Sequence, residues 1–167
     1  MKLSILFVNL FLIGIGGIKA QEEYYNSENK SKMNDLSVMI GFWEGDGWSM
    51  NSETRIKEEF KQREEIQFDL DSTIITVKGI GKSKGKIVHD AFAIISPHPK
   101  AGYFMTSFLG DGRDGKYELT GSNGNYVWKI PTPQGTVIYT MHITNDTWNE
   151  IGSFEMNGQQ FPFFEMN

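Results

Sequence analysis

Residues 55–70 read RIKEEFKQREEIQFDL, and their side chains alternate in character with a period of two. Every odd-numbered position is polar or charged, whereas five of the eight even-numbered positions are apolar: Ile56, Phe60, Ile66, Phe68 and Leu70. A helix does not explain this pattern, because Ile66, Phe68 and Leu70 would not share one helical face. The stretch therefore predicts a long β-strand with one face in water and the other against a core.

Similar signals continue along the chain, with a strand expected about every ten residues. Further strands are expected near Trp43 and at residues 72–80, 86–96, 102–109, 116–120, 126–130, 136–143, 148–156 and 161–166. Turns containing Gly, Asn or Pro separate these runs, and no amphipathic helix of three turns lies between any two of them. Short loops join strands as antiparallel hairpins, since a parallel crossover needs more residues.

The sequence therefore predicts an all-β fold, an antiparallel up-and-down barrel of about ten strands. Closure into a barrel hides the edges of such a meander. A two-sheet sandwich is the alternative, but it requires longer crossing connections than these loops provide. A short helical turn carrying Leu36, Met39 and Ile40 is expected before the first strand.

A glycine-rich motif of the form G-x-W-x-G-x-G opens the first expected strand, at residues 41–47 (GFWEGDG). Trp43 has enough apolar area to close one end of a barrel, and the glycines let the strand bend over the barrel floor. The alternative is a chance cluster in a chain with 18 Gly and 4 Trp. A second motif, DTWNEIG at residues 146–152, is followed by Asn157-Gly158 and by FFEM at residues 163–166.

With these motifs the chain resembles the lipocalin-like (calycin) superfamily over about residues 36–167. It is most similar to bacterial domains of the DUF1579 type and to nitrobindin-like ten-stranded barrels. Nitrobindin-like haem sites use a His on the last strands followed by a terminal Arg, and residues 161–167 contain neither. The resemblance therefore implies the fold but no haem, and we expect no cofactor. The Trp–Arg contact that often closes lipocalin barrels would require Arg55 or Arg63.

The N-terminal residues 1–20, MKLSILFVNLFLIGIGGIKA, have the layout of a secretory signal peptide. The alternative, a membrane anchor, is disfavoured because the apolar run is about 16 residues and a spanning helix needs roughly 20. Residues 21–33 are polar and are expected to form a flexible tether, which leaves residues 34–167 as the barrel domain. We therefore expect an exported protein, periplasmic or secreted, with no stable membrane insertion after cleavage.

Composition and motif spacing exclude several kinds of site. The formal net charge of −5 argues against a general nucleic-acid binder. The absence of Cys excludes disulfides, thiolate metal sites and cysteine nucleophiles. No two His have metal-ligand spacing, so no metal site is expected. The P-loop-like residues 79–83 lack the required first Gly, and Arg113 occupies a ligand position in the calcium-loop-like residues 111–115.

Candidate binding residues come from polar side chains on faces that the alternation predicts to be inward. His89 alternates with small residues and either lines a cavity or serves as a structural His. Glu64 and Glu150 alternate with apolar neighbours, and a buried carboxylate needs a partner or a ligand. Alternatively, strand twist exposes Glu58 and Glu64 near the barrel rims. The predicted ligand-binding residues are Trp43, Glu64, His89, Tyr103, Met105, Trp128, Tyr139, Met141 and Glu150.

We therefore expect a monomeric barrel that binds a small hydrophobic or amphipathic molecule in its interior. His89, Glu64 and Glu150 would make the polar contacts, and the aromatic and Met side chains would form the apolar walls. One alternative is an isomerase or hydrolase that uses the inward acids and His89. Another is a barrel that binds a protein at the cell surface. The remaining histidines are assigned no role: His142 is expected to point outward, and His98 to be solvated between two prolines.

Overall fold

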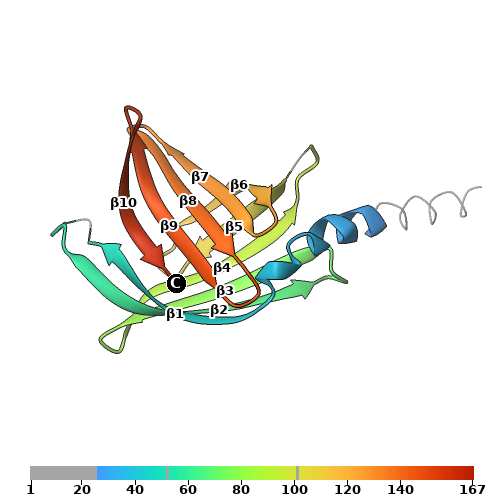
Figure 1. Cartoon of the computed structure of the whole chain (residues 1–167), viewed down its shortest axis with the longest axis horizontal. Helices are drawn as coiled ribbons and strands as arrows, with labels where there is room; N and C mark the ends of the chain where they lie inside the picture. Colours follow the sequence, from blue (N-terminus) through green and yellow to red (C-terminus); the bar gives the residue numbers. More distant parts are fainter. Residues whose placement is uncertain (1–25, 52, 101) are drawn as a thin grey trace, which may run out of the picture.

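Ten antiparallel strands close into one barrel, each paired with its neighbour in sequence and the last with the first (Figure 1). The computed structural model describes residues 26–51, 53–100 and 102–167. Its strands are β1 (Gly41–Met50), β2 (Lys57–Asp69), β3 (Ile74–Ser83), β4 (Lys86–Pro97), β5 (Tyr103–Leu109), β6 (Asp114–Ser122), β7 (Asn125–Thr132), β8 (Gly135–Ile143), β9 (Trp148–Met156) and β10 (Gln159–Met166). The predicted up-and-down barrel is confirmed, and the sandwich alternative is wrong.

Strand β2 shows how the alternating sequence becomes the barrel wall. Its even-numbered residues from Phe60 to Ile66 are buried inside the barrel, while the intervening odd-numbered residues are exposed. On the outer face Lys61 pairs with Asp46 at 2.9 Å. Ion pairs between exposed side chains contribute little to stability, so burial of the inner face is what stabilises this strand in the barrel.

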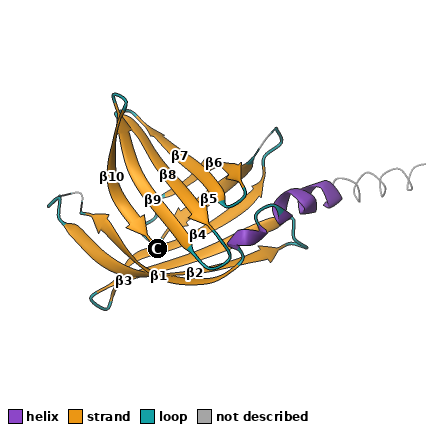
Figure 2. Cartoon of the chain, viewed as in Figure 1, coloured by secondary structure: helices purple, strands orange, loops and turns teal. Residues whose placement is uncertain are grey.

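A helical segment lies at one end of the barrel (Figure 2). The sequence predicts a flexible tether at residues 21–33, but residues 26–34 form a helix, followed by the 3-10 helix η1 (Ser37–Met39). Met33, Leu36 and Met39 of this segment are almost completely buried in the main hydrophobic core. Met33 is the single apolar residue of the helix at residues 26–34, which is too little to reveal a helix in the sequence, and contacts with the barrel order it.

Hydrogen bonds from three aromatic side chains help to hold this segment in place. The hydroxyls of Tyr103 and Tyr126 donate to the backbone oxygens of Lys32 and Asp35, at 3.0 and 3.1 Å. The indole Nε1 of Trp43 donates to the backbone oxygen of Met39 at 2.9 Å. This contact takes the place of the Trp–Arg contact considered above.

Neither candidate arginine reaches Trp43. Arg63 lies on the outer face near Glu44, and Arg55 is an exposed residue between β1 and β2. The expected signal peptide lies outside the described residues. None of the described helices is long and apolar enough to cross a membrane.

The two ends of the barrel differ. We call the end that holds the helical segment the closed end, and the opposite end, formed by the hairpin turns after the odd-numbered strands, the mouth. Strands β1 and β10 pair through three residue pairs, Gly47–Met166 to Ser49–Phe164, whereas β1 and β2 pair through ten. Figure 1 shows the β1–β2 and β9–β10 hairpins diverging from this short seam at the mouth.

Candidate functional site

The inner wall divides into a packed half at the closed end and a polar half toward the mouth. Tyr103 and Met141, which the sequence assigns to the binding site, are buried in the core around the helical segment. Trp43 and Met105 are partly buried and pack against the same core. These four residues therefore serve mainly to close the barrel. Glu64, His89 and Tyr139 lie beyond them, whereas Trp128 packs against the edge of the same core and Glu150 pairs with Met141, so these last two mark the inner limit of the mouth half.

Glu64 lies on the inner face of β2 opposite Gly79 of β3 and is 9 % exposed. A Cβ at Gly79 would lie 2.6 and 2.7 Å from the two carboxyl oxygens of Glu64, so the glycine makes room for this side chain. The neighbouring inward residue Gln62 donates from Nε2 to Glu64 Oε1 at 2.6 Å. The other amide atom, Gln62 Oε1, is buried and accepts no hydrogen bond from any described residue.

Glu150 of β9 is 8 % exposed and faces the same interior. Trp128 Nε1 of β7 donates to its Oε1 at 3.3 Å. Trp148 lies close enough to lower the pKa of Glu150, although its buried Nε1 forms no hydrogen bond of normal geometry with the described residues. The hydrogen bond to Glu150 from the described residues thus comes from an indole N–H group, which carries no charge.

Burial raises the pKa of both carboxyl groups to about 7. For Glu64 desolvation is the main cause, and the hydrogen bond from Gln62 opposes it. For Glu150 desolvation is again the main cause, the hydrogen bond from Trp128 opposes it, and the charge of Glu64 raises the pKa further. Neither carboxyl forms an ion pair within the described part of the chain.

Aromatic rings form a continuous wall beside these acids. The rings of Trp128 and Tyr139 stack with centroids 4.2 Å apart and planes within 7°. Tyr117 of β6 packs on Trp128 at 5.4 Å, and Phe164 of β10 meets Tyr139 edge-on at 5.9 Å. Phe164 also stacks on Phe60 of β2 at 5.7 Å. The wall therefore runs from β6 through β10 to β2.

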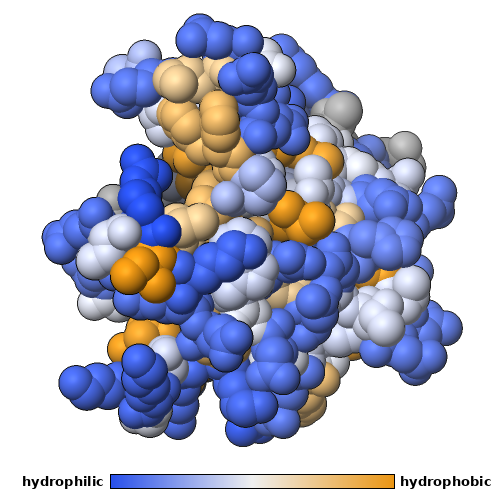
Figure 3. Space-filling model, turned by 60° about the vertical axis from the view of Figure 1, so that its left-hand side comes forward, coloured by the Kyte–Doolittle hydropathy of each residue, from blue (hydrophilic) through white to orange (hydrophobic). Residues whose placement is uncertain are grey.

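The mouth half of the interior is open to solvent. Met156 and Phe161 are in register with the inner face near the mouth, yet they are 40 and 48 % exposed. His89 also belongs to the inward register, opposite Gly81, and is exposed. Figure 3, which turns the mouth side toward the viewer, shows this face hollowed, with hydrophobic side chains around the hollow. Solvent can thus approach the polar half of the interior from the mouth.

Charged groups at the mouth influence His89. Desolvation by the surrounding wall lowers the pKa of His89, the charge of Asp90 raises it, and the charge of Arg113 lowers it. Arg113 is exposed in the β5–β6 turn and binds Asp111 at 2.7 Å. Its charge also acts on Tyr139, whose pKa is raised chiefly by burial. No hydrogen bond or ion pair within the described residues joins His89 to Glu64 or Glu150.

The structure also shows the positions of His142, His98 and Glu58. His142 points outward, as expected, and lies 2.8 Å from Asn125. His98 is not solvated, because it is half-buried against Phe104, with ring centroids 4.3 Å apart. Glu58 is exposed at the mouth and bonds to Asn51, so the rim alternative holds for Glu58 and not for Glu64.

The side chains of the described residues do not favour a metal site or a haem site. Among the described residues no three His, Asp or Glu side chains group closely enough to hold a metal ion. The inner face of β10 presents Phe161, Phe164 and Met166 where nitrobindin-like barrels carry a His. None of these three residues is the His that the resemblance associates with haem at that strand.

Several wall residues are absent from the set predicted above. Tyr117 could have been found, because it alternates with the buried Leu119. Phe164 could not, because a bulge between Pro162 and Phe164 shifts the inward register of β10 by one residue. Gln62 occupies one of the even-numbered, inward positions of residues 55–70, but an amide gives no sequence signal of an unfilled hydrogen bond.

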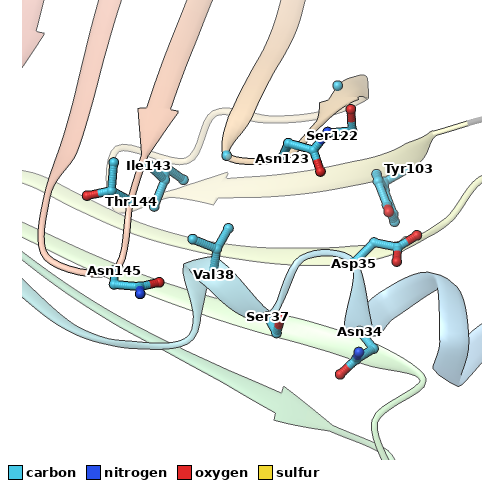
Figure 4. Close-up of a pocket in the computed structure, with 12 residues that line it drawn as sticks. Asn34, Asp35, Ser37, Val38, Tyr103, Ser122, Asn123, Ile143, Thr144 and Asn145 are labelled. Atoms are coloured by element: carbon cyan, nitrogen blue, oxygen red, sulfur yellow. The ribbon is translucent and has the colours of Figure 1, made fainter.

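An open pocket of about 670 Å³ lies elsewhere, at the closed end (Figure 4). Its lining includes Val38 of η1 and turn residues such as Asn123 and Asn145. A smaller pocket of about 280 Å³ lies among β7, β8 and β9 and includes Asn125 and His142. Neither pocket includes Glu64 or Glu150, and neither is lined by a buried carboxyl group.

The comparisons with known proteins agree with the fold. No family model matches the chain, and no curated protein sequence matches it. The crystal structure of Rv2717c from M. tuberculosis is similar, with a TM-score of 0.62, 12 % identity, and coverage of 81 % of this chain and 94 % of that chain. At this identity the likeness shows the fold alone, a closed antiparallel β-barrel.

Proposed function

We propose that the barrel binds a small, partly apolar molecule in the mouth half of its interior. One observation carries the proposal: Glu64 and Glu150 are both buried there without an ion-pair partner in the described chain. A buried carboxyl without such a partner is unfavourable for folding, and a ligand could satisfy it. The aromatic wall around Trp128 and Tyr139 offers apolar contact to the rest of that ligand.

We also propose a cellular location, an oligomeric state and a family for the barrel. We infer export through residues 1–20, to the periplasm or outside the cell, and a monomer in solution. We also infer a place among DUF1579-type or nitrobindin-like domains, which the likeness to Rv2717c supports at the level of fold. The two alternatives, an enzyme and a protein-binding barrel, stay predictions. The enzyme would use His89 together with an inward acid, and no contact between them occurs among the described residues.

Binding of the neutral fluorophore N-phenyl-1-naphthylamine tests the proposal. Its fluorescence should rise to saturation at one molecule per barrel. Ala91 faces the interior from β4, whereas its neighbour Phe92 lies on the outer face and is 41 % exposed. Ala91→Trp should block binding by filling the interior, and Phe92→Trp should leave it intact. Equal binding by both folded variants would overturn the proposal.

Native mass spectrometry of the protein purified from its host would then identify a retained ligand. A mass difference that disappears in Ala91→Trp but persists in Phe92→Trp would support binding inside the barrel. A ligand retained equally by both variants would contradict it.

A further inference from the structure

We infer that the ligand is an organic cation whose ammonium group lies between Glu64 and Glu150 while its apolar part packs on the Trp128–Tyr139 wall. This inference rests on the proposed function and adds the chemical class of the ligand. It depends on three features of the inner wall: the uncompensated acids, an unfilled acceptor and the aromatic rings.

The acids have no basic partner, because the lysines and arginines of the adjoining strands point outward. Lys61, Arg63 and Lys78 are exposed on the outer faces of β2 and β3. The other titratable or charged groups around the interior are His89 on β4, Tyr117 on β6, Tyr139 on β8, the Arg113–Asp111 pair at the mouth, Glu58 at the rim, and Tyr103 and Tyr126 in the closed-end core. Nothing among them supplies a buried positive charge to Glu64 or Glu150.

Gln62 gives an independent indication of a donor-bearing ligand. Its side chain is 7 % exposed, and its Nε2 already donates to Glu64. Its Oε1 lies over the inner face at Gly81, where a Cβ would approach it to 2.6 Å, and accepts no hydrogen bond from the described residues. An ammonium group has up to three N–H donors and no acceptor, which matches a site made of acceptors.

The aromatic wall suits the same class of molecule. Cations are attracted to the faces of Trp and Tyr rings, and an apolar body gains from burial against them. Trp128 both stacks on Tyr139 and donates to Glu150, so one residue joins the apolar wall to the acid. A ligand with an aromatic or aliphatic body two or three bonds from its nitrogen would engage both.

Ligand binding should also be coupled to proton release. Each carboxyl has a pKa of about 7 in the free barrel, so at pH 5.5 both are mostly protonated. An ammonium ion favours the ionised form of both groups. Its affinity should therefore rise with pH, by up to tenfold per pH unit for each proton released, until the carboxyls are ionised.

Three probes of similar shape and different charge test the inference: 2-phenylethylammonium, 2-phenylethanol and 3-phenylpropanoate. Calorimetric titration at pH 8 should show the ammonium binding at least tenfold more tightly than the alcohol, and no binding of the carboxylate. The affinity for the ammonium should fall at least tenfold at pH 5.5, while that for the alcohol stays constant. Titrations in two buffers of different ionisation enthalpy should report the released protons.

Substitutions test whether Glu64 and Glu150 cause the preference for the ammonium probe. Glu64→Gln and Glu150→Gln should each reduce the preference for ammonium over alcohol by tenfold or more, and cooperative unfolding in urea should show that both variants fold. Glu65→Gln, on the exposed outer face of β2, should leave the preference unaltered. Equal binding of the ammonium and the alcohol would overturn the inference and leave the proposed function standing. If the unmodified protein does not bind N-phenyl-1-naphthylamine, the proposed function itself is overturned.

Discussion

Replacing Glu150 by Gln should stabilise the protein at pH 8 and have little effect at pH 4.5. Gln has nearly the same shape, and its amide oxygen can still accept the hydrogen bond from Trp128. The amide is neutral at every pH, so the substitution removes only the need to ionise a carboxyl inside the barrel. The effect therefore isolates the free energy of burying that charge.

The magnitude follows from proton linkage. The pKa of Glu150 rises from 4.5 to about 7 on folding. Between these two pH values the folded state binds more protons at Glu150 than the unfolded state does. The contribution of Glu150 to the free energy of unfolding is therefore most favourable below pH 4.5 and falls as the pH rises through 7. At about 1.4 kcal/mol per pKa unit, the loss amounts to roughly 3 kcal/mol above pH 7. Glu150→Gln should recover most of this amount.

Urea denaturation of both proteins from pH 4.5 to 8 measures the difference. The free energies of unfolding should agree within about 1 kcal/mol at pH 4.5 and diverge progressively above it. Glu65→Gln, on the exposed face of β2, should follow the unmodified protein at every pH. A constant offset between Glu150→Gln and the unmodified protein across the range would refute the reasoning, because it would show that the carboxyl ionises as easily when folded as when unfolded.

Three further substitutions test the packing. Leu36→Ala should lower the free energy of unfolding by about 2–5 kcal/mol in urea titrations, since Leu36 is 0 % exposed; a loss below 1 kcal/mol would contradict its place in the core. Gly79→Ala should displace the Glu64 carboxyl and reduce stability by about 1–3 kcal/mol, and this loss should vanish in a Glu64→Ala background; an equal loss in both backgrounds would rule out the clash. Tyr126→Phe removes the hydrogen bond to the Asp35 backbone and should reduce stability by about 1 kcal/mol while speeding amide exchange in the N-terminal helix; unchanged exchange would show that the bond does not hold the helix.

The barrel was predictable because side-chain parity in a strand is set by the backbone. In β2 the alternation of polar and apolar residues fixes which face is inward over its whole length, and short hairpin turns leave an antiparallel meander as the simplest topology. The helix at residues 26–34 was not predictable, since its sequence is polar apart from Met33. Its order comes from contacts with Tyr103 and Tyr126, which are 71 and 91 residues away in sequence.

The candidate site was predictable in part for the same reason. Alternation identifies Glu64, Glu150 and Tyr139 as inward, and the structure brings all three to one region of the wall. Alternation alone does not say which half of the interior is filled. Tyr103 and Met141 have the same inward parity, yet they lie in the closed-end core because the helical segment packs there.

The two halves of the barrel make opposite contributions to its stability. Filling the closed end with Met33, Leu36 and Met39 buries apolar surface, which favours folding. The mouth half instead holds Glu64 and Glu150, and ionising both at neutral pH opposes folding. Apolar residues at these two positions would pack against the aromatic wall without that loss. Residues that reduce stability where a better-packed alternative exists are expected at functional sites. The two acids therefore favour the mouth half as the proposed ligand-binding part of the barrel, rather than the larger pocket at the closed end.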